Sequence, residues 1–346
     1  MMKPFILILS LFCSVCFANV LSEPGDTTQA NIDIQEWLVP WPNTRPRDPA
    51  VDSTGNVWFC GQGGNYIAVF NPNSKKFKRF KLSENTHPHN LIIDSNDNVW
   101  YAGNRNSHIG KLNPKTGDIK KFIMPGDTAI DPHTLVFNSQ QNIWFTAQWG
   151  NKVGFLNRKT KHITLVDMPF ASSRPYGIKV DHQDVPWVVL FGSNKLLSIN
   201  PENFRTSIVE LRDAAERPRR LEISETNDVY YLDHKLGYLG RHDPKTQNLE
   251  RWRLPEGHKA KLYGSAIDSK NRIWLALTGT KPNKIKVFDS KIEQFIGSVD
   301  VPSGAGSIRY MYYHRQSDEV WFGTDANTIG RVRIKRLSYW QRATGN

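Results

Sequence analysis

Cysteine is scarce in this sequence, with three among 346 residues. Cys13 and Cys16 fall in an N-terminal segment that we expect to be cleaved, which leaves Cys60 alone in the mature chain. A single cysteine cannot form an intramolecular disulfide, so packing must stabilise the fold. Cys60 lies two residues after Trp58 in an expected strand, where a buried, inert thiol is favoured over a nucleophile.

Long apolar runs are also rare. Residues 5–12 form an apolar core after Lys3, and the small residue Ala18 precedes an expected cleavage site before Asn19. The run is shorter than the roughly 20 residues that a membrane-spanning helix needs. We therefore predict a signal peptide over residues 1–18, no membrane span, and a periplasmic or secreted protein. A lipoprotein anchor at Cys16 is the alternative, although the three residues before it make a poor lipobox.

Acidic residues are outnumbered, because 45 Lys and Arg face 33 Asp and Glu, a net charge of +12. A basic surface attracts nucleic acid, anionic lipid or acidic small molecules, and export argues against nucleic acid. The sequence also lacks a GxSxG elbow, a Walker loop and a dinucleotide fingerprint, so the enzyme classes that use them are not indicated. These features favour a small anionic ligand as the partner.

What the sequence does contain is an internal repeat. A strand-like aromatic residue recurs at intervals of 42, 44, 43, 43, 44 and 47 residues. The seven markers are Trp58, Trp100, Trp144, Trp187, Tyr230, Trp274 and Trp321. Around each marker the pattern predicts four short strands separated by polar turns, as in residues 90–124. Four strands at a period of about 40 to 45 residues are typical of a propeller blade.

Seven markers predict an all-β fold, a seven-bladed β-propeller with four-stranded blades. The seventh copy ends after its third strand at residues 329–334, and residues 34–40 resemble the outer strands of other copies. An N-terminal strand that completes the last blade as its outer strand would close the ring and remove a free sheet edge. We therefore expect one propeller over residues 19–334 and a tail over residues 335–346. An open solenoid or two sandwiches would not account for these complementary ends.

Polar side chains recur where the chain turns towards the axis before each innermost strand and where each second strand ends. Loops usually carry Ser, Asn or Gly, whereas this sequence places His, Arg and Tyr there. The candidate ligand-binding residues are Arg47, His87, Asn104, Arg105, Gln148, Arg174, Tyr176, Arg217, Arg219, Tyr263 and Arg309. Arginine forks suit carboxylate, sulfate or phosphate groups. A salt-bridge network with Asp48, Asp131 and Asp233 is the alternative use of these arginines.

Histidines at the same register are candidates for proton transfer. His87, His89 and His133 fall in two adjacent copies of the repeat. An imidazole near its normal pKa can accept or donate a proton at neutral pH. Binding of a transition metal is the alternative, but only Asp131 is near enough in sequence to add a carboxylate.

The repeat also carries a family resemblance. Three of its motifs, in residues 132–135 (PHTL), 144–146 (WFT) and 150–154 (GNKVG), resemble the virginiamycin B lyase (streptogramin lyase) family, and the resemblance covers nearly the whole mature chain. It implies a seven-bladed propeller that opens a cyclic depsipeptide by Mg²⁺-dependent elimination, without water. It also implies that His133 is the base, that His89 is the histidine of the preceding blade, and that Asp131 is a metal ligand. Ala147 stands where the family has a second acidic ligand, which leaves Asp131, with Gln148 and water, to hold Mg²⁺.

We therefore expect a monomeric carbon–oxygen lyase that acts on a small cyclic ester or anionic metabolite. His133 would be the base, His89 would orient the substrate or donate a proton, and arginines such as Arg219 would neutralise negative charge. A non-catalytic propeller that binds an anionic ligand or a partner protein is the main alternative. A lactonase-type hydrolase is the other, but the site has few carboxylates to hold its divalent cation.

Overall fold

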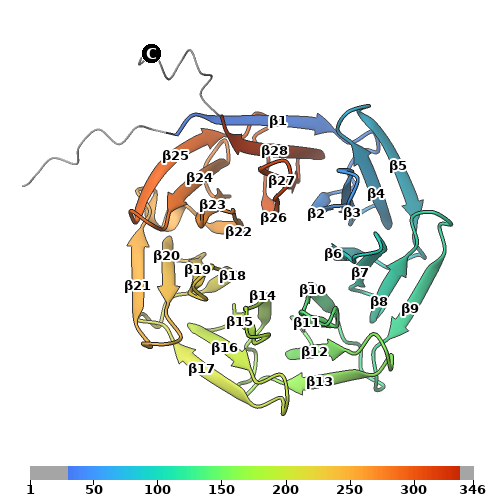
Figure 1. Ribbon diagram of the computed structural model, residues 1–346, viewed down its shortest axis with the longest axis horizontal. Coiled ribbons are helices and arrows are strands. Elements are labelled where there is room, and N and C mark those ends of the chain that lie inside the picture. Colours follow the sequence, from blue (N-terminus) through green and yellow to red (C-terminus); the bar gives the residue numbers. More distant parts are fainter. Residues whose placement is uncertain (1–29, 336–346) are drawn as a thin grey trace, which may run out of the picture.

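The computed structural model describes residues 30–335, in which 28 strands form seven four-stranded antiparallel sheets around a central axis (Figure 1). This arrangement confirms the predicted seven-bladed propeller. The predicted signal peptide, residues 1–18, and residues 336–346 of the predicted tail lie outside the described residues.

In each blade except the last, four consecutive strands run in order from the axis to the rim. The first three blades contain β2 (Pro46–Val51), β3 (Val57–Gly61), β4 (Tyr66–Asn71), β5 (Lys76–Lys81), β6 (Pro88–Ile93), β7 (Val99–Gly103), β8 (His108–Leu112), β9 (Ile119–Ile123), β10 (Pro132–Phe137), β11 (Ile143–Ala147), β12 (Lys152–Leu156) and β13 (Ile163–Asp167). The next three contain β14 (Pro175–Val180), β15 (Pro186–Leu190), β16 (Lys195–Ile199), β17 (Thr206–Glu210), β18 (Pro218–Ile223), β19 (Val229–Asp233), β20 (Tyr238–His242), β21 (Leu249–Arg253), the 3-10 turn η1 (Gly257–Lys259), β22 (Leu262–Ile267), β23 (Arg272–Leu277), β24 (Lys284–Asp289) and β25 (Gln294–Asp300).

The seventh blade joins the two ends of the propeller. It consists of β26 (Ile308–His314), β27 (Glu319–Thr324) and β28 (Thr328–Ile334), with β1 (Ile32–Leu38) as its outer strand (Figure 1). β1 pairs antiparallel with β28 along its whole length. The predicted closure is confirmed, with the strand starting two residues earlier than the sequence pattern indicated. No edge of β28 is left free for pairing with another chain.

The aromatic markers are buried between blades, each at the second or third residue of a second strand. In four blades the indole N–H donates to an aspartate six residues earlier, over 2.8 to 3.1 Å. The same aspartate caps the turn between the first two strands, as Asp52 does by accepting from the backbone N–H of Asn56. One side chain thus ties the turn to the interblade core, which is why aromatic residue and turn recur together.

Every innermost strand contains an irregularity soon after it begins, where its pairing with the second strand shifts register. A β-bulge interrupts the strict alternation of side chains between two faces. In β2 the bulge gives Asp48 a φ of 48°, and both Arg47 and Asp48 reach contacts near the axis. The bulges therefore supply two layers of side chains to the centre of the ring.

Candidate functional site

A cavity of about 640 Å³ lies at the axis, where the innermost strands begin and the second strands end. This volume is in the range of small-molecule sites. Eleven of the 14 predicted site residues line it: Arg47, His87, His89, Asn104, Arg105, Asp131, His133, Gln148, Tyr176, Tyr263 and Arg309. The structure thus brings together side chains from six of the seven blades.

Three predicted residues do not line the cavity. Arg174 stacks on Trp149 at the rim, with its guanidinium carbon 4.5 Å from the ring centroid. Arg217 donates to the carbonyl oxygens of Ala214 and Glu216 in its own loop, which holds it away from the axis. Arg219 lies behind the wall, with its guanidinium carbon 3.4 Å from the ring centroid of Tyr263.

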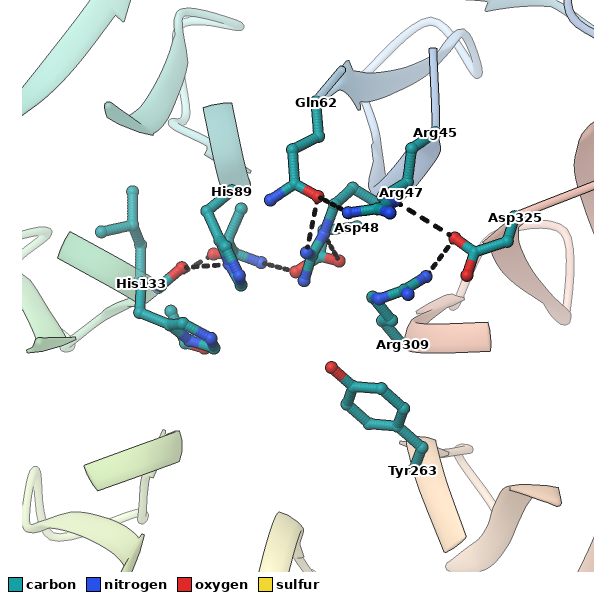
Figure 2. Close-up of polar contacts among 12 residues, drawn as sticks. Arg45, Arg47, Asp48, Gln62, His89, His133, Tyr263, Arg309 and Asp325 are labelled. Carbon is teal, nitrogen blue, oxygen red and sulfur yellow. Dashed lines mark hydrogen bonds and ion pairs between the residues drawn. The ribbon is translucent and has the colours of Figure 1, made fainter. Parts of the chain in front are cut away.

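One side of the cavity is cationic (Figure 2). Arg47 and Arg45 both donate to the Gln62 side-chain oxygen, over 3.2 and 3.4 Å. Arg309 makes an ion pair with Asp325, whose carboxylate also lies 3.5 Å from Arg45. One partly exposed carboxylate therefore serves two arginines, and this wall keeps a net positive charge.

A second layer of side chains lies beneath the cavity. Asp48, which is fully buried, accepts from Arg47 Nε over 2.9 Å and from Asn90 Nδ2 over 3.0 Å. Its other neighbour is Arg220, from the opposite side of the ring, at 3.7 Å. Arg220 is also buried and donates to the Thr134 hydroxyl and to the carbonyl oxygen of Arg309. One buried aspartate thus lies between two buried arginines.

Two histidine rings, His89 and His133, lie against each other in the wall opposite Arg309 (Figure 2), with centroids 3.7 Å apart and ring planes tilted by 38°. His89 Nδ1 lies 3.2 Å from the carbonyl oxygen of His133, which can only accept, so His89 carries its proton on Nδ1 and leaves Nε2 as an acceptor. His133 Nδ1 lies 2.9 Å from the Thr134 hydroxyl, which already accepts from Arg220. The Thr134 hydrogen is satisfied only if it is donated to His133 Nδ1, which places the His133 proton on Nε2.

Burial and nearby arginines keep these imidazoles neutral. Burial is the largest cause that lowers the pKa of His89 and His133 well below the usual value, and the charges of Arg47 and Arg220 act in the same direction. At His87, burial and Arg105 lower the pKa to about 4. At neutral pH the cavity therefore presents uncharged histidines beside charged arginines.

Tyr176 and Tyr263 complete the wall from blades four and six. Their hydroxyl groups are hydrogen-bonded to each other, and both side chains are buried. Tyr176 also lies against His133, with ring centroids 4.2 Å apart. In Figure 2 the Tyr263 hydroxyl points towards the centre of the ring, between Arg309 and His133.

The carboxylate of Asp131, the predicted metal ligand, is already hydrogen-bonded to its own loop. Both of its carboxylate oxygens accept from the backbone N–H of Trp149 over 3.0 Å, and one also accepts from Gly150 over 2.7 Å. Ala147 offers no ligand, and residues 30–335 contain no cluster of three or more His, Cys, Asp or Glu side chains suited to a metal. With several arginines also lining the cavity, these residues do not fit Mg²⁺.

The cavity also includes residues outside the set of candidate ligand-binding residues. Arg45 and Gln62 line it, and both stand at register positions that the sequence assigns to this face, before an innermost strand and at the end of a second strand. Trp149 lines it as well and was not predicted. The second layer, with Asp48, Asn90, Thr134 and Arg220, carries no such signal. It follows the first layer by one residue, and an alternating strand would direct these side chains away from the axis.

Comparisons with solved structures agree with this fold. Virginiamycin B lyase from Staphylococcus aureus is 19% identical, with a TM-score of 0.80, over 88% of this chain and 100% of that chain. A catalytically inactive variant of that enzyme with quinupristin gives 19% identity and a TM-score of 0.79, over 88% and 100% of the two chains. An extracellular domain of a two-component system from B. thetaiotaomicron is 13% identical, with a TM-score of 0.68, over 90% of this chain and 44% of that chain. At these identities the likeness concerns the fold alone.

No curated protein matches the sequence. No helix within the described residues is long and apolar enough to cross a membrane. The model of the Virginiamycin B lyase family matches residues 33–288, which is more than half of the chain. The chain therefore belongs to the virginiamycin B lyase family.

Proposed function

We propose that the axial cavity binds a small molecule bearing a carboxylate or a similar anionic group, and that the protein is an exported carbon–oxygen lyase acting on it. The observation that carries the proposal is the charge of the cavity wall. Four arginines line it, namely Arg45, Arg47, Arg105 and Arg309. Three of them share two carboxylates, Asp325 and the buried Asp48, while Asp131 is already bonded to backbone N–H groups. Guanidinium groups in such a wall favour an anion over a metal ion.

Family membership and the neutral histidines support the elimination chemistry. In an elimination, a base takes a proton from carbon, the C–H electron pair forms a C=C bond, and the C–O pair leaves with oxygen. The departing oxygen would face the Nε2–H group of His133 and the charge of Arg309, which stabilise negative charge as it develops. The sequence suggested His133 as the base, but its hydrogen bonds favour the role of a proton donor in this reaction.

A binding protein without catalysis is the second candidate. It is favoured by the use of Asp131 as a turn cap and by the absence of a second acidic residue at Ala147, because the family resemblance implies a metal held by two such residues. The extracellular two-component domain with a similar fold is consistent with this role and with export. Both candidates use the same cavity and the same anionic ligand.

Two measurements test the proposal. Calorimetry with citrate as a carboxylate probe should detect binding that weakens by about tenfold or more in Arg105→Gln and Arg309→Gln, since each loses a charge-assisted hydrogen bond. Arg205→Gln, on an exposed loop outside the cavity, is the matched control and should bind as the wild type does. Equal affinity in all four proteins would remove the anion site.

The catalytic part is tested with quinupristin as a cyclic ester probe, analysed by mass spectrometry in ¹⁸O-labelled water. Elimination opens the ring without a change of mass and without incorporation of the label. Label in the product would indicate a hydrolase instead. Citrate binding together with no ring opening of this or simpler cyclic esters would favour the binding protein.

A further inference from the structure

An excess of positive charge surrounds the tyrosine pair in the cavity wall. Arg47 and Arg220 share Asp48, and Arg219 makes no ion pair within residues 30–335. The guanidinium carbons of Arg219 and Arg220 lie 5.2 and 5.1 Å from the Tyr176 ring centroid. Three buried or half-buried cations thus face one buried carboxylate, an environment that favours loss of a proton from a nearby acid.

The hydrogen bonds point to the same acid. The hydroxyl groups of Tyr176 and Tyr263 are bonded to each other, and neither has another side-chain or backbone partner in the described part of the chain. If Tyr263 donates, the proton of Tyr176 has no protein acceptor, although the side chain is only 4% exposed. A phenolate at Tyr176 has no such proton, accepts from Tyr263 and offsets part of the arginine charge.

The two tyrosines also differ in acidity. Burial would raise the pKa of Tyr176, but Arg219, Arg220 and Arg47 outweigh burial and lower the pKa below its usual value. Burial and the neighbouring Tyr176 raise the pKa of Tyr263 to about 12. This order of pKa values favours Tyr176 over Tyr263 as the group that loses a proton.

The same positive field weakens the histidines as bases. It lowers the pKa of His89 and His133 well below 6.5, after burial as the largest cause, so each imidazole has little affinity for a proton. General-base strength increases with the pKa of the base. Among the groups that line the cavity, an ionised phenol is therefore a stronger proton acceptor than either histidine.

We propose that Tyr176, held by the Tyr263 hydroxyl and flanked by Arg219 and Arg220, is the proton acceptor of this site. Its chemical use rests on the proposed function. In the elimination, the Tyr176 oxygen takes the proton from the carbon next to the one that bears the ester oxygen. The C–H pair becomes the C=C bond, the C–O pair leaves with the ester oxygen as a carboxylate, and Tyr176 becomes a neutral phenol that later returns its proton to solvent.

A pH titration followed by the near-ultraviolet absorbance of phenolate tests the assignment without any ligand. The wild type should show one tyrosine that ionises at a lower pH than the usual value of about 10 for this side chain. Tyr176→Phe should lose that early step. Tyr238→Phe, which removes a half-buried tyrosine beside Arg251 in another blade, is the matched control and should keep it.

Two further variants separate the causes. Arg219→Gln should move the early ionisation to higher pH, because it removes a neighbouring cation. Tyr263→Phe should do the same, because the phenolate loses its hydrogen-bond donor. An early step that persists in Tyr176→Phe, or its absence from the wild type, overturns the proposal.

Citrate then separates this proposal from the proposed function. A bound anion competes with the phenolate for the arginine charge, so saturating citrate should return the proton to Tyr176 and reduce the phenolate absorbance. An early ionisation that citrate does not change leaves the Tyr176 assignment intact and counts against the anion site. Citrate binding without an early ionisation supports the anion site and overturns the role of Tyr176.

Discussion

Replacing Asp48 by asparagine should destabilise the protein more than any other single loss of a carboxylate at the site. Asp48 is fully buried and is the anion between Arg47, at 2.9 Å, and Arg220, at 3.7 Å. Asparagine keeps the size of the side chain and one acceptor oxygen but removes the charge. Two buried guanidinium groups then face each other with no counter-ion.

Breaking a buried ion pair by removing one partner typically costs about 3–5 kcal/mol, because the other charge stays buried without compensation. We expect a loss of this size in the free energy of unfolding, measured by equilibrium urea unfolding with tryptophan fluorescence. Asp325→Asn is the matched control. Its carboxylate also lies between two arginines, Arg45 and Arg309, but it is 29% exposed, so its loss should cost about 1 kcal/mol or less.

Two results would refute this reasoning. The first is a loss in Asp48→Asn no larger than in Asp325→Asn, which would mean that solvent or relaxation screens the inner arginines. The second is the response of the variant to an added anion. An anion that binds only the folded state, at a concentration of about 100 times its Kd, should restore about 2.7 kcal/mol of the free energy of unfolding. If saturating citrate stabilises the variant no more than it stabilises the wild type, the cavity and the inner layer are electrostatically independent.

Two other outcomes follow from the structure. Burial and Arg219 lower the pKa of His234 to about 4, so below about pH 6.5 the unfolded chain binds a proton that the folded chain does not. The free energy of unfolding should therefore be highest above about pH 6.5 and decrease towards pH 4, and it should change less with pH in His234→Asn. The same pH dependence in wild type and variant, measured by urea unfolding, would contradict this reasoning. The indole N–H of Trp144 is buried without a partner within the described residues, because Asn138 stands where four other blades have aspartate. Asn138→Asp should therefore raise the free energy of unfolding by about 1 kcal/mol. No gain in urea unfolding would show that the missing hydrogen bond does not limit stability.

The repeat made the fold predictable from sequence. Each blade repeats a turn aspartate or its substitute and an aromatic residue six positions later, such as Asp94 and Trp100. Because equivalent contacts recur around the ring, the same strand pattern appears seven times in the sequence, and each weak copy supports the assignment of the others. The end strand was predictable for a related reason, since residues 34–40 match a position that the seventh copy lacks, and β1 occupies it.

The first layer of the site was predictable for the same reason, but the second was not. Residues at equivalent places before each inner strand share one location, so Arg47, His133 and Tyr263 could be assigned to one face from their register alone. Arg174 and Arg217 have suitable places, but Arg174 stacks on Trp149 at the rim and Arg217 donates to local carbonyl groups, and the register alone does not predict either contact. The histidine tautomers and the hydrogen bond between the two tyrosines likewise depend on neighbours from other blades, which the sequence does not place.

Within the second layer of side chains, Arg220 spans several blades, and the two blades beside it have no side chain at the equivalent position. Arg220 reaches Thr134 and the carbonyl oxygen of Arg309, which lie in the third and seventh blades, two away on either side. The flanking blades have glycine at the equivalent position, Gly177 and Gly264. A Cβ at Gly177 would lie 3.1 Å from the Arg220 Cα, and one at Gly264 would lie 3.1 Å from the Ile308 carbonyl oxygen, both tighter than ordinary contacts. These glycines therefore let neighbouring innermost strands approach each other closely. Arg220 extends between these strands, where its charge acts on His133, Tyr176 and Asp48 together.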